Sequence, residues 1–245
     1  MFRNGFVDNK RRALLAGGGA LVFSVALWPR RAPAQTKLRI GIIGSGHIGG
    51  TIGGLWVKAA HPVLFSSRHP EELKDLVAGL GDLAQAGTVE QAIAFGDVLF
   101  IAVPYGALPQ IGQDYGAALK GKIMLDACNA VTARDGTITD EVEREGVGVV
   151  SQKYLPGTRL VRAFNIPNYK IFASEANRPD PKLGIPIAGD DSEAVQVAAG
   201  LVRDAGFDPV VVGKLKDAIR FQRGGPGYGP SLTAAELRQK LSLAP

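Results

Sequence analysis

A glycine pattern at residues 44–49 has the spacing of a phosphate-binding loop. Gly44, Gly46 and Gly49 form the motif G-x-G-x-x-G, which follows an apolar run and precedes apolar residues at helical spacing. The first glycine permits a tight turn, the second lets the backbone approach a pyrophosphate, and the third lets helix and strand pack closely. Exposed amides at the helix start attract the anion. We therefore expect a dinucleotide site that includes Gly44, Ser45, Gly46, His47, Ile48 and Gly49.

The residues about 20 positions after such a motif select the dinucleotide. An acidic side chain there would bond the ribose 2′-hydroxyl of NAD and repel a phosphate. This chain has Ser66, Ser67 and Arg68 instead. Hydroxyl groups donate hydrogen bonds to phosphate, and a guanidinium pairs with its charge. The sequence predicts NADP(H) as the cofactor; the alternative is that Arg68 is only a solvated loop residue.

Further polar residues follow the central strands, where ligands bind in open α/β sheets. Tyr105, Asn129 and Asn165 are candidates for the nicotinamide side, with His47 on the first helix. Hydride transfer between two rings needs proximity and orientation more than a strong acid or base, so no catalytic residue is assigned. Each Asn could instead close a turn after its strand, and His47 could contact phosphate. The other predicted cofactor contacts are Val103, Pro104 and Ala130.

Alternating strands and helices are expected to bring these residues to one edge of a sheet. From Leu38 onward, short β-rich runs alternate with amphipathic stretches, which is typical of a parallel sheet with helices on both faces. The apolar runs are continuous, as expected for strands buried on both sides. The predicted strands are 38–43, 63–66, 83–86, 97–103, 122–126, 159–164, 184–188 and 209–212. We predict an α/β fold with a doubly wound, mostly parallel Rossmann-type sheet.

Two helix starts are marked by capping residues. Thr88 and Gln91 have the spacing of a capping box, and Asp191 precedes a long apolar-periodic stretch. The expected tail has a segment at 214–222, a glycine- and proline-rich run at 224–230 and a helix at 233–241. We predict an NADP-binding domain over 35–213, with the tail of 214–245 packed on it.

Composition excludes several function classes. The chain has 245 residues, 46% of them hydrophobic and 21% charged, as in one or two globular domains. Cys128 and three histidines cannot form a Cys/His zinc cluster, so no metal site is predicted. Residues 1–34 hold six of the 28 basic residues and one of the 23 acidic ones, which accounts for the net charge of +5. The rest is neutral, so nucleic acid is not a predicted partner.

Residues 1–34 have the composition of an export signal. Lys10, Arg11 and Arg12 precede a 16-residue apolar run, and Ala32-Pro33-Ala34 follows it. The adjacent arginines resemble a twin-arginine signal, the type used for proteins exported already folded. The run is short for a bilayer-spanning helix, which needs about 20 residues, so we predict no stable span in the mature chain. We expect cleavage and a periplasmic location; the alternative is an uncleaved membrane anchor.

Several segments together resemble one family. They are GSGHIG at 44–49, SSR at 66–68, FIAVP at 100–104, LDACN at 125–129 and VRAFN at 161–165. Over most of 38–215 the chain is similar to the NADP oxidoreductases dependent on coenzyme F420, a deazaflavin, and to the related NADPH domain of six-transmembrane metalloreductases. The resemblance implies Ser67 and Arg68 as ligands of the 2′-phosphate. It also implies that Val103, Pro104 and Tyr105 line the adenosine-ribose or nicotinamide side.

The resemblance further implies a flavin or deazaflavin site beside the NADPH site. The expected function is therefore hydride transfer between NADP(H) and a flavin, deazaflavin or similar small redox acceptor. Two alternatives stay open: an NADP-binding module that partners another redox protein, and a reductase of 3-hydroxyacids or imines. The acceptor, the direction of transfer and a homodimer are also left open. The glycine- and proline-rich run at 224–230 has no counterpart that we can map onto the deazaflavin enzymes.

Overall fold

The computed structural model describes residues 37–165, 168–229 and 231–243. In this part of the chain, eight strands form one sheet in the order β3-β2-β1-β4-β5-β6-β7-β8. The strands are β1 (Ile40–Ile43), β2 (Val63–Ser66), β3 (Ala84–Gly87), β4 (Val98–Ile101), β5 (Ile123–Asp126), β6 (Arg159–Arg162), β7 (Gly184–Gly189) and β8 (Asp208–Gly213). All neighbouring pairs are parallel except β6 and β7. The predicted α/β, mostly parallel fold is confirmed.

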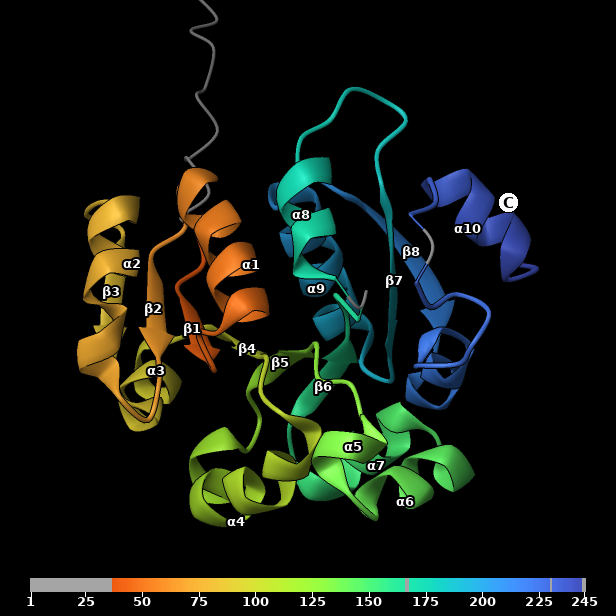
Figure 1. Ribbon diagram of the computed structural model, residues 1–245, viewed down its shortest axis with the longest axis horizontal. Helices are drawn as coiled ribbons and strands as arrows, with labels where there is room; N and C mark the ends of the chain where they lie inside the picture. The colour runs from red at the N-terminus through yellow and green to blue at the C-terminus, as the bar shows by residue number, and fades with distance from the viewer. Residues whose placement is uncertain (1–36, 166–167, 230, 244–245) are drawn as a thin grey trace, which may run out of the picture. The chain divides into compact units, whose positions relative to one another are not determined.

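Helices cover both faces of the sheet (Figure 1). The helices are α1 (His47–Lys58), α2 (Lys74–Leu80), α3 (Val89–Phe95), α4 (Leu108–Leu119), α5 (Thr132–Asp135), α6 (Ile138–Glu145), α7 (Val147–Tyr154), α8 (Tyr169–Glu175), α9 (Ser192–Asp204) and α10 (Ala234–Lys240). The 3₁₀ helices are η1 (Pro70–Leu73), η2 (Tyr105–Ala107) and η3 (Leu215–Phe221). No helix in the described residues is long and apolar enough to span a bilayer.

The continuous apolar strands supply two cores at once. In β4, Val98 and Phe100 pack into the core under α1, α8 and α9, while Leu99 and Ile101 pack into the core under α3, α4 and α7. Successive side chains of a strand point to opposite faces, so a strand covered on both sides must be apolar throughout. This arrangement fixes β4 in the middle of the sheet, beside β1.

Two predicted strands are shorter than expected at their carboxyl ends. The predicted strand 97–103 ends at Ile101, because Pro104 has no N–H for a ladder bond and η2 begins at the next residue. The predicted strand 159–164 ends at Arg162, and Phe164 then adopts a left-handed backbone with φ of 59°. The residues predicted as strand but found outside it, 102–103 and 163–164, begin the loops of the candidate site.

The local helix signals act as expected. Thr88 Oγ1 accepts from the Gln91 amide, and the Gln91 side chain accepts from the Thr88 amide, which completes the capping box of α3. Asp191 caps α9 by accepting from the Ala194 amide at 3.0 Å. In the tail, 215–221 forms a 3₁₀ helix that packs on α7, and α10 follows a capping box at Thr233.

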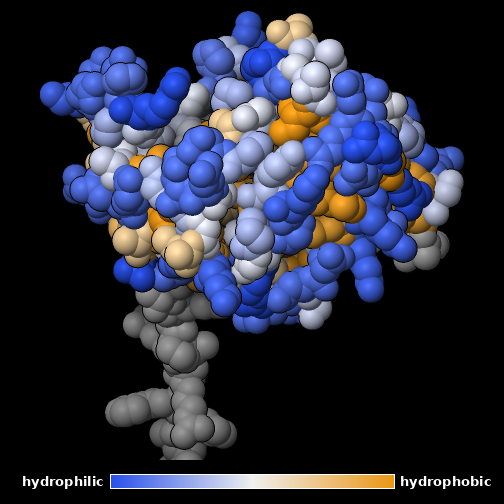
Figure 2. All heavy atoms as spheres, turned by 90° about the horizontal axis from the view of Figure 1, so that it is seen from below, coloured by the Kyte–Doolittle hydropathy of each residue, from blue (hydrophilic) through white to orange (hydrophobic). Residues whose placement is uncertain are grey.

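Hydrophobic side chains also reach the surface. The large ones exposed in the described residues are Leu83, Val149, Val211 and Ile219. Figure 2 shows small hydrophobic groups between hydrophilic side chains on the face seen from below. The homodimer stays a prediction.

Candidate functional site

The site lies where the order of the strands reverses. After β1 the chain crosses to β2 and β3 on one side, and β4 pairs with the other side of β1. In open α/β sheets, the loops at the carboxyl ends of such neighbouring strands diverge and leave a crevice for a ligand. Here the loop from β1 to α1 faces the residues that follow β4, since the Ala102 amide donates to the Ile43 carbonyl at 2.9 Å.

The fold itself requires two of the three motif glycines. Gly44 has φ of 94°, and a Cβ there would lie 2.6 Å from Val103 Cγ1. A Cβ at Gly49 would lie 2.1 Å from the Gly44 carbonyl oxygen. Gly46 differs, because a Cβ at this position meets no protein atom within 4 Å and its φ is −72°. No protein atom therefore requires glycine at position 46. A ligand that approaches the backbone closely would require it.

Unsatisfied donors surround Gly46. This residue is the N-cap of α1, where no side chain accepts from the first amides and no acidic residue lies in the first turn. Ser45 Oγ is buried and has no hydrogen-bond partner in the described residues. Free amides and the positive end of a 12-residue helix favour an anion. A dinucleotide pyrophosphate fits these groups.

A cavity of about 670 Å³ extends from the glycine loop toward the end of β2. Ser67 and Arg68 line it together with Gly44, Ser45 and Gly46. Arg68 makes no ion pair with the described residues. The carboxylates of Glu72 and Asp114 also line the cavity. The structure thus places a free guanidinium at the end of the cavity where the sequence predicts the 2′-phosphate.

A second cavity of about 500 Å³ lies on the other side of the loop after β4. It shares Ala102, Val103 and Pro104 with the first cavity. His47, Ile48 and Asn129 are also among its lining residues. The His47 ring stacks on Tyr169, with centroids 4.3 Å apart and planes 8° apart. The two cavities could therefore hold the two halves of one dinucleotide around residues 102–104.

Two predicted site residues, Ser66 and Tyr105, lie away from both cavities. The Ser66 hydroxyl is buried and donates to the Ile42 carbonyl at 2.6 Å, so it joins β2 to β1. Tyr105 is fully buried, and its hydroxyl bonds the Val147 carbonyl and Ser151 Oγ, both at 3.0 Å. Burial raises the pKa of the Tyr105 phenol well above its usual range. Neither residue lines the two cavities, because the Ser66 hydroxyl bonds the neighbouring strand β1 and the Tyr105 hydroxyl bonds α7.

Asn165 is buried and contacts Cys128 and Asn129 without lining either cavity. It is 2% exposed, and its Nδ2 lies 3.4 Å from the Cys128 carbonyl and from Asn129 Oδ1. Asn129 Nδ2 in turn donates to the Asn165 carbonyl at 3.2 Å. The two amides therefore hold two strand ends together. Only Asn129 reaches the second cavity, while Ala130 lines a smaller one next to it.

Sequence reasoning missed a buried ion pair beneath Asn129. Asp126 on β5 and Arg162 on β6 pair with each other, and neither side chain has any exposed surface. Asp126 Oδ1 accepts from the Cys128 amide at 2.8 Å, and Arg162 donates to the Cys128 carbonyl at 2.5 Å. Cys128 is itself buried, which raises its thiol pKa. The pair thus fixes both the backbone amide and the backbone carbonyl of Cys128, the residue before Asn129.

Three further lining residues were also missed. Arg134 is part of no recognisable motif, Arg223 immediately precedes the glycine- and proline-rich run at 224–230, and Tyr228 belongs to that run. That run was the available signal for the last two, but the sequence did not show where it folds. The structure brings it to the second cavity, next to Asn129.

Comparisons with known proteins show which family and which folds this chain resembles. Residues 39–130 match the family model described as NADP oxidoreductase, coenzyme F420-dependent. The chain is 29% identical over 202 residues to metalloreductase STEAP3 of Rattus norvegicus, covering 80% of this chain and 37% of that protein. The chain therefore spans just over a third of that relative. The resemblance seen in the sequence is confirmed.

Two solved structures share the fold. A hypothetical protein of Sinorhizobium meliloti, SMa0349, is 27% identical with a TM-score of 0.70, covering 80% of this chain and 95% of that one. A candidate F420-dependent NADP reductase of Arthrobacter sp. FB24 is 19% identical with a TM-score of 0.64, covering 74% and 87%. Both likenesses extend past residue 130, so the shared architecture includes strands beyond the matched family region.

Proposed function

We propose that this chain, whose residues 39–130 match the model of the F420-dependent NADP oxidoreductase family, transfers hydride between NADP(H) and a flavin-like ring compound. The open space at Gly46 carries the proposal. A side chain there would meet no protein atom, while Ser45 Oγ and the first amides of α1 lack partners beside it. These groups suit a pyrophosphate, and the cavities on either side suit the two nucleosides.

Different residues would bind different parts of the cofactor. Ser67 and Arg68 would hold the 2′-phosphate, the loop 44–46 the pyrophosphate, and Asn129 the nicotinamide side. When bound, NADPH supplies a hydride, two electrons and a proton from C4 of its dihydronicotinamide, to a ring acceptor that takes its second proton from water. The chain's contribution is to orient the two rings, which requires no acid or base.

Turnover tests the proposal directly. We expect the purified full chain to oxidise NADPH with at least one of FMN, riboflavin, a deazaflavin or a quinone, measured by loss of nicotinamide absorbance. Tight NADPH binding with no turnover for any of these would instead favour the module that partners another redox protein. Turnover only with 3-hydroxyacids or imines would favour that reductase class.

Arg68→Glu is expected to reverse the cofactor preference. In the unmodified protein the guanidinium pairs with the 2′-phosphate, and charged hydrogen bonds of this kind correspond to about a 10- to 100-fold preference for NADP(H) over NAD(H). A glutamate repels that phosphate and can accept from a ribose hydroxyl. Calorimetric titration of both cofactors measures the ratio. Lys74→Glu, a charge reversal on α2 outside the lining residues, serves as the control. Equal affinities in the unmodified protein would contradict the assignment.

We further propose that residues 1–34 direct export of the folded chain with its cofactor. This segment lies outside the described residues, and the proposal rests on Arg11, Arg12 and the apolar run after them. NADPH is a cytoplasmic metabolite, so an exported protein must carry its nucleotide with it. We expect a periplasmic fraction whose N-terminus lies near Gln35 and which releases NADP(H) on denaturation. Cytoplasmic retention with Met1 intact would contradict export, and a periplasmic protein without nucleotide would contradict the carried cofactor.

A further inference from the structure

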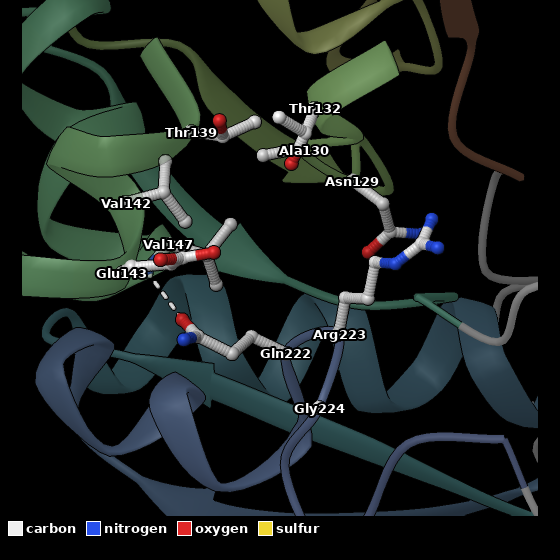
Figure 3. Close-up of a pocket in the computed structure, with 10 residues that line it drawn as sticks. All are labelled: Asn129, Ala130, Thr132, Thr139, Val142, Glu143, Val147, Gln222, Arg223 and Gly224. Atoms are coloured by element: carbon white, nitrogen blue, oxygen red, sulfur yellow. Dashed lines mark hydrogen bonds between the residues drawn. The ribbon is translucent and has the colours of Figure 1, made fainter. Parts of the chain in front are cut away.

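The carboxy-terminal loop at 222–229 forms one wall of the second cavity. Arg223 and Tyr228 line this cavity together with Asn129. The loop is anchored before Arg223, because Phe221 is 1% exposed and Gln222 Oε1 accepts from the Val147 amide at 2.8 Å, as Figure 3 shows. The Gly227 amide closes it by donating to the Arg220 carbonyl at 2.9 Å. The backbone therefore holds residue 223 at the cavity.

The charges around this cavity are of one sign. Its charged lining residues are Arg134 and Arg223, and no carboxylate lines it. Arg134 is already neutralised, since its guanidinium bonds both carboxylate oxygens of Asp135 at 2.8 and 3.0 Å. It also donates to the Asn129 carbonyl at 2.7 Å. Arg134 is thus a positioning residue, and its charge is not available to a ligand.

Of the two arginines that line this cavity, Arg223 is the one without an ion-pair partner in the described residues. It is exposed and makes no ion pair with them. It also does not line the cavity of the glycine loop. In that cavity, Ser45 and Arg68 are the residues that we assign to the phosphates of the cofactor. An exposed charge on an anchored backbone, at a cavity that lacks a carboxylate, is arranged for an anion from outside the protein.

A smaller cavity limits where that anion can lie. It has a volume of about 280 Å³ and shares Asn129 and Arg223 with the larger one. In Figure 3, Arg223 extends from the loop toward Asn129, and Glu143 lies across the small cavity from it. The Glu143 carboxylate would repel an anion inside the small cavity. The favourable position for an anion is therefore on the side of the larger cavity.

We propose that Arg223 binds a phosphate group carried by the ring acceptor and so selects phosphorylated flavin-type acceptors over neutral ones. This inference rests on the proposed function, because it assigns the acceptor's phosphate and not the cofactor's. Tyr228, on the same loop, supplies an aromatic surface beside this charge. The tail that the family region does not include thus determines the substrate class of the site.

FMN and riboflavin test this proposal, because they differ only in the 5′-phosphate. We measure the Kd of each for the NADP⁺-loaded full chain by flavin fluorescence, and the kcat/KM of NADPH oxidation with each. A charged hydrogen bond to phosphate predicts a preference for FMN of about 10-fold or more. Arg223→Gln is expected to reduce this preference to about 2-fold, as the charge-assisted bond is lost, with an unchanged Kd for NADP⁺.

Arg220→Gln is the matched control, because it removes one positive charge from the same tail outside the lining residues. We expect it to keep the FMN preference. Equal binding of FMN and riboflavin to the unmodified protein overturns the proposal. So does an Arg223→Gln variant that weakens NADP⁺ binding and leaves the FMN preference intact. A preference for FMN that depends on Arg223, without NADPH turnover, would support the phosphate site and contradict the proposed reaction.

Discussion

Gly46→Val is expected to abolish NADP(H) binding while the fold stays intact. The new side chain meets no protein atom within 4 Å, and the backbone at φ of −72° suits any residue. The valine would instead occupy the space beside Ser45 Oγ and the first amides of α1, where we place the pyrophosphate. Loss of that anion contact corresponds to a Kd increase of about 100-fold or more. Calorimetric titration measures the Kd, and circular dichroism with thermal unfolding monitors the fold.

Two neighbouring glycines provide the controls. At Gly50 a Cβ would make only ordinary contacts, 3.7 Å from a Leu76 methyl group and the Ser45 carbonyl, so Gly50→Ala should keep both fold and binding. At Gly49 a Cβ would lie 2.1 Å from the Gly44 carbonyl, so Gly49→Ala should lose stability before binding can be measured. NADP(H) binding by Gly46→Val with the affinity of the unmodified protein would remove the central site assignment.

The glycine motif shows how much of the site the sequence could predict. The spacing of Gly44, Gly46 and Gly49 predicts a loop between a strand and a helix, and the structure has that loop. Continuous apolar runs such as 98–101 predict buried strands because each must fill two cores. These signals are local, and each depends on a few adjacent residues. They could be found without knowledge of the sheet order.

The remaining site residues depend on contacts between distant segments. The type and position of Tyr105 suggest a ligand contact, but its hydroxyl turns to Val147 and Ser151, which no local pattern predicts. Arg223 lies almost 100 residues after Asn129, and only the packing of η3 on α7 brings the two together. Charge and burial at such positions are decided by tertiary partners, so the sequence alone could not assign them.

The buried ion pair of Asp126 and Arg162 is expected to give the largest loss of stability on substitution. Neither side chain is exposed, so removal of one partner leaves the other charge buried and uncompensated. Arg162→Met or Asp126→Asn should each lower the free energy of unfolding by about 3–5 kcal/mol. Urea unfolding measures the loss. Arg39→Met serves as the control, because the ion pair of Arg39 with Asp97 is 53% and 39% exposed and such pairs contribute at most about 1 kcal/mol.

The double variant Asp126→Leu/Arg162→Met separates stability from site geometry. With both charges gone, it should be more stable than either single variant, because no uncompensated charge stays buried. It should still bind NADP(H) more weakly than the unmodified protein, since the Cys128 amide and carbonyl lose the partners that hold them at 2.8 and 2.5 Å. Cys128 leads directly to Asn129 at the second cavity. Single variants that lose less than about 1 kcal/mol would show that water reaches the pair and that it does not fix the loop.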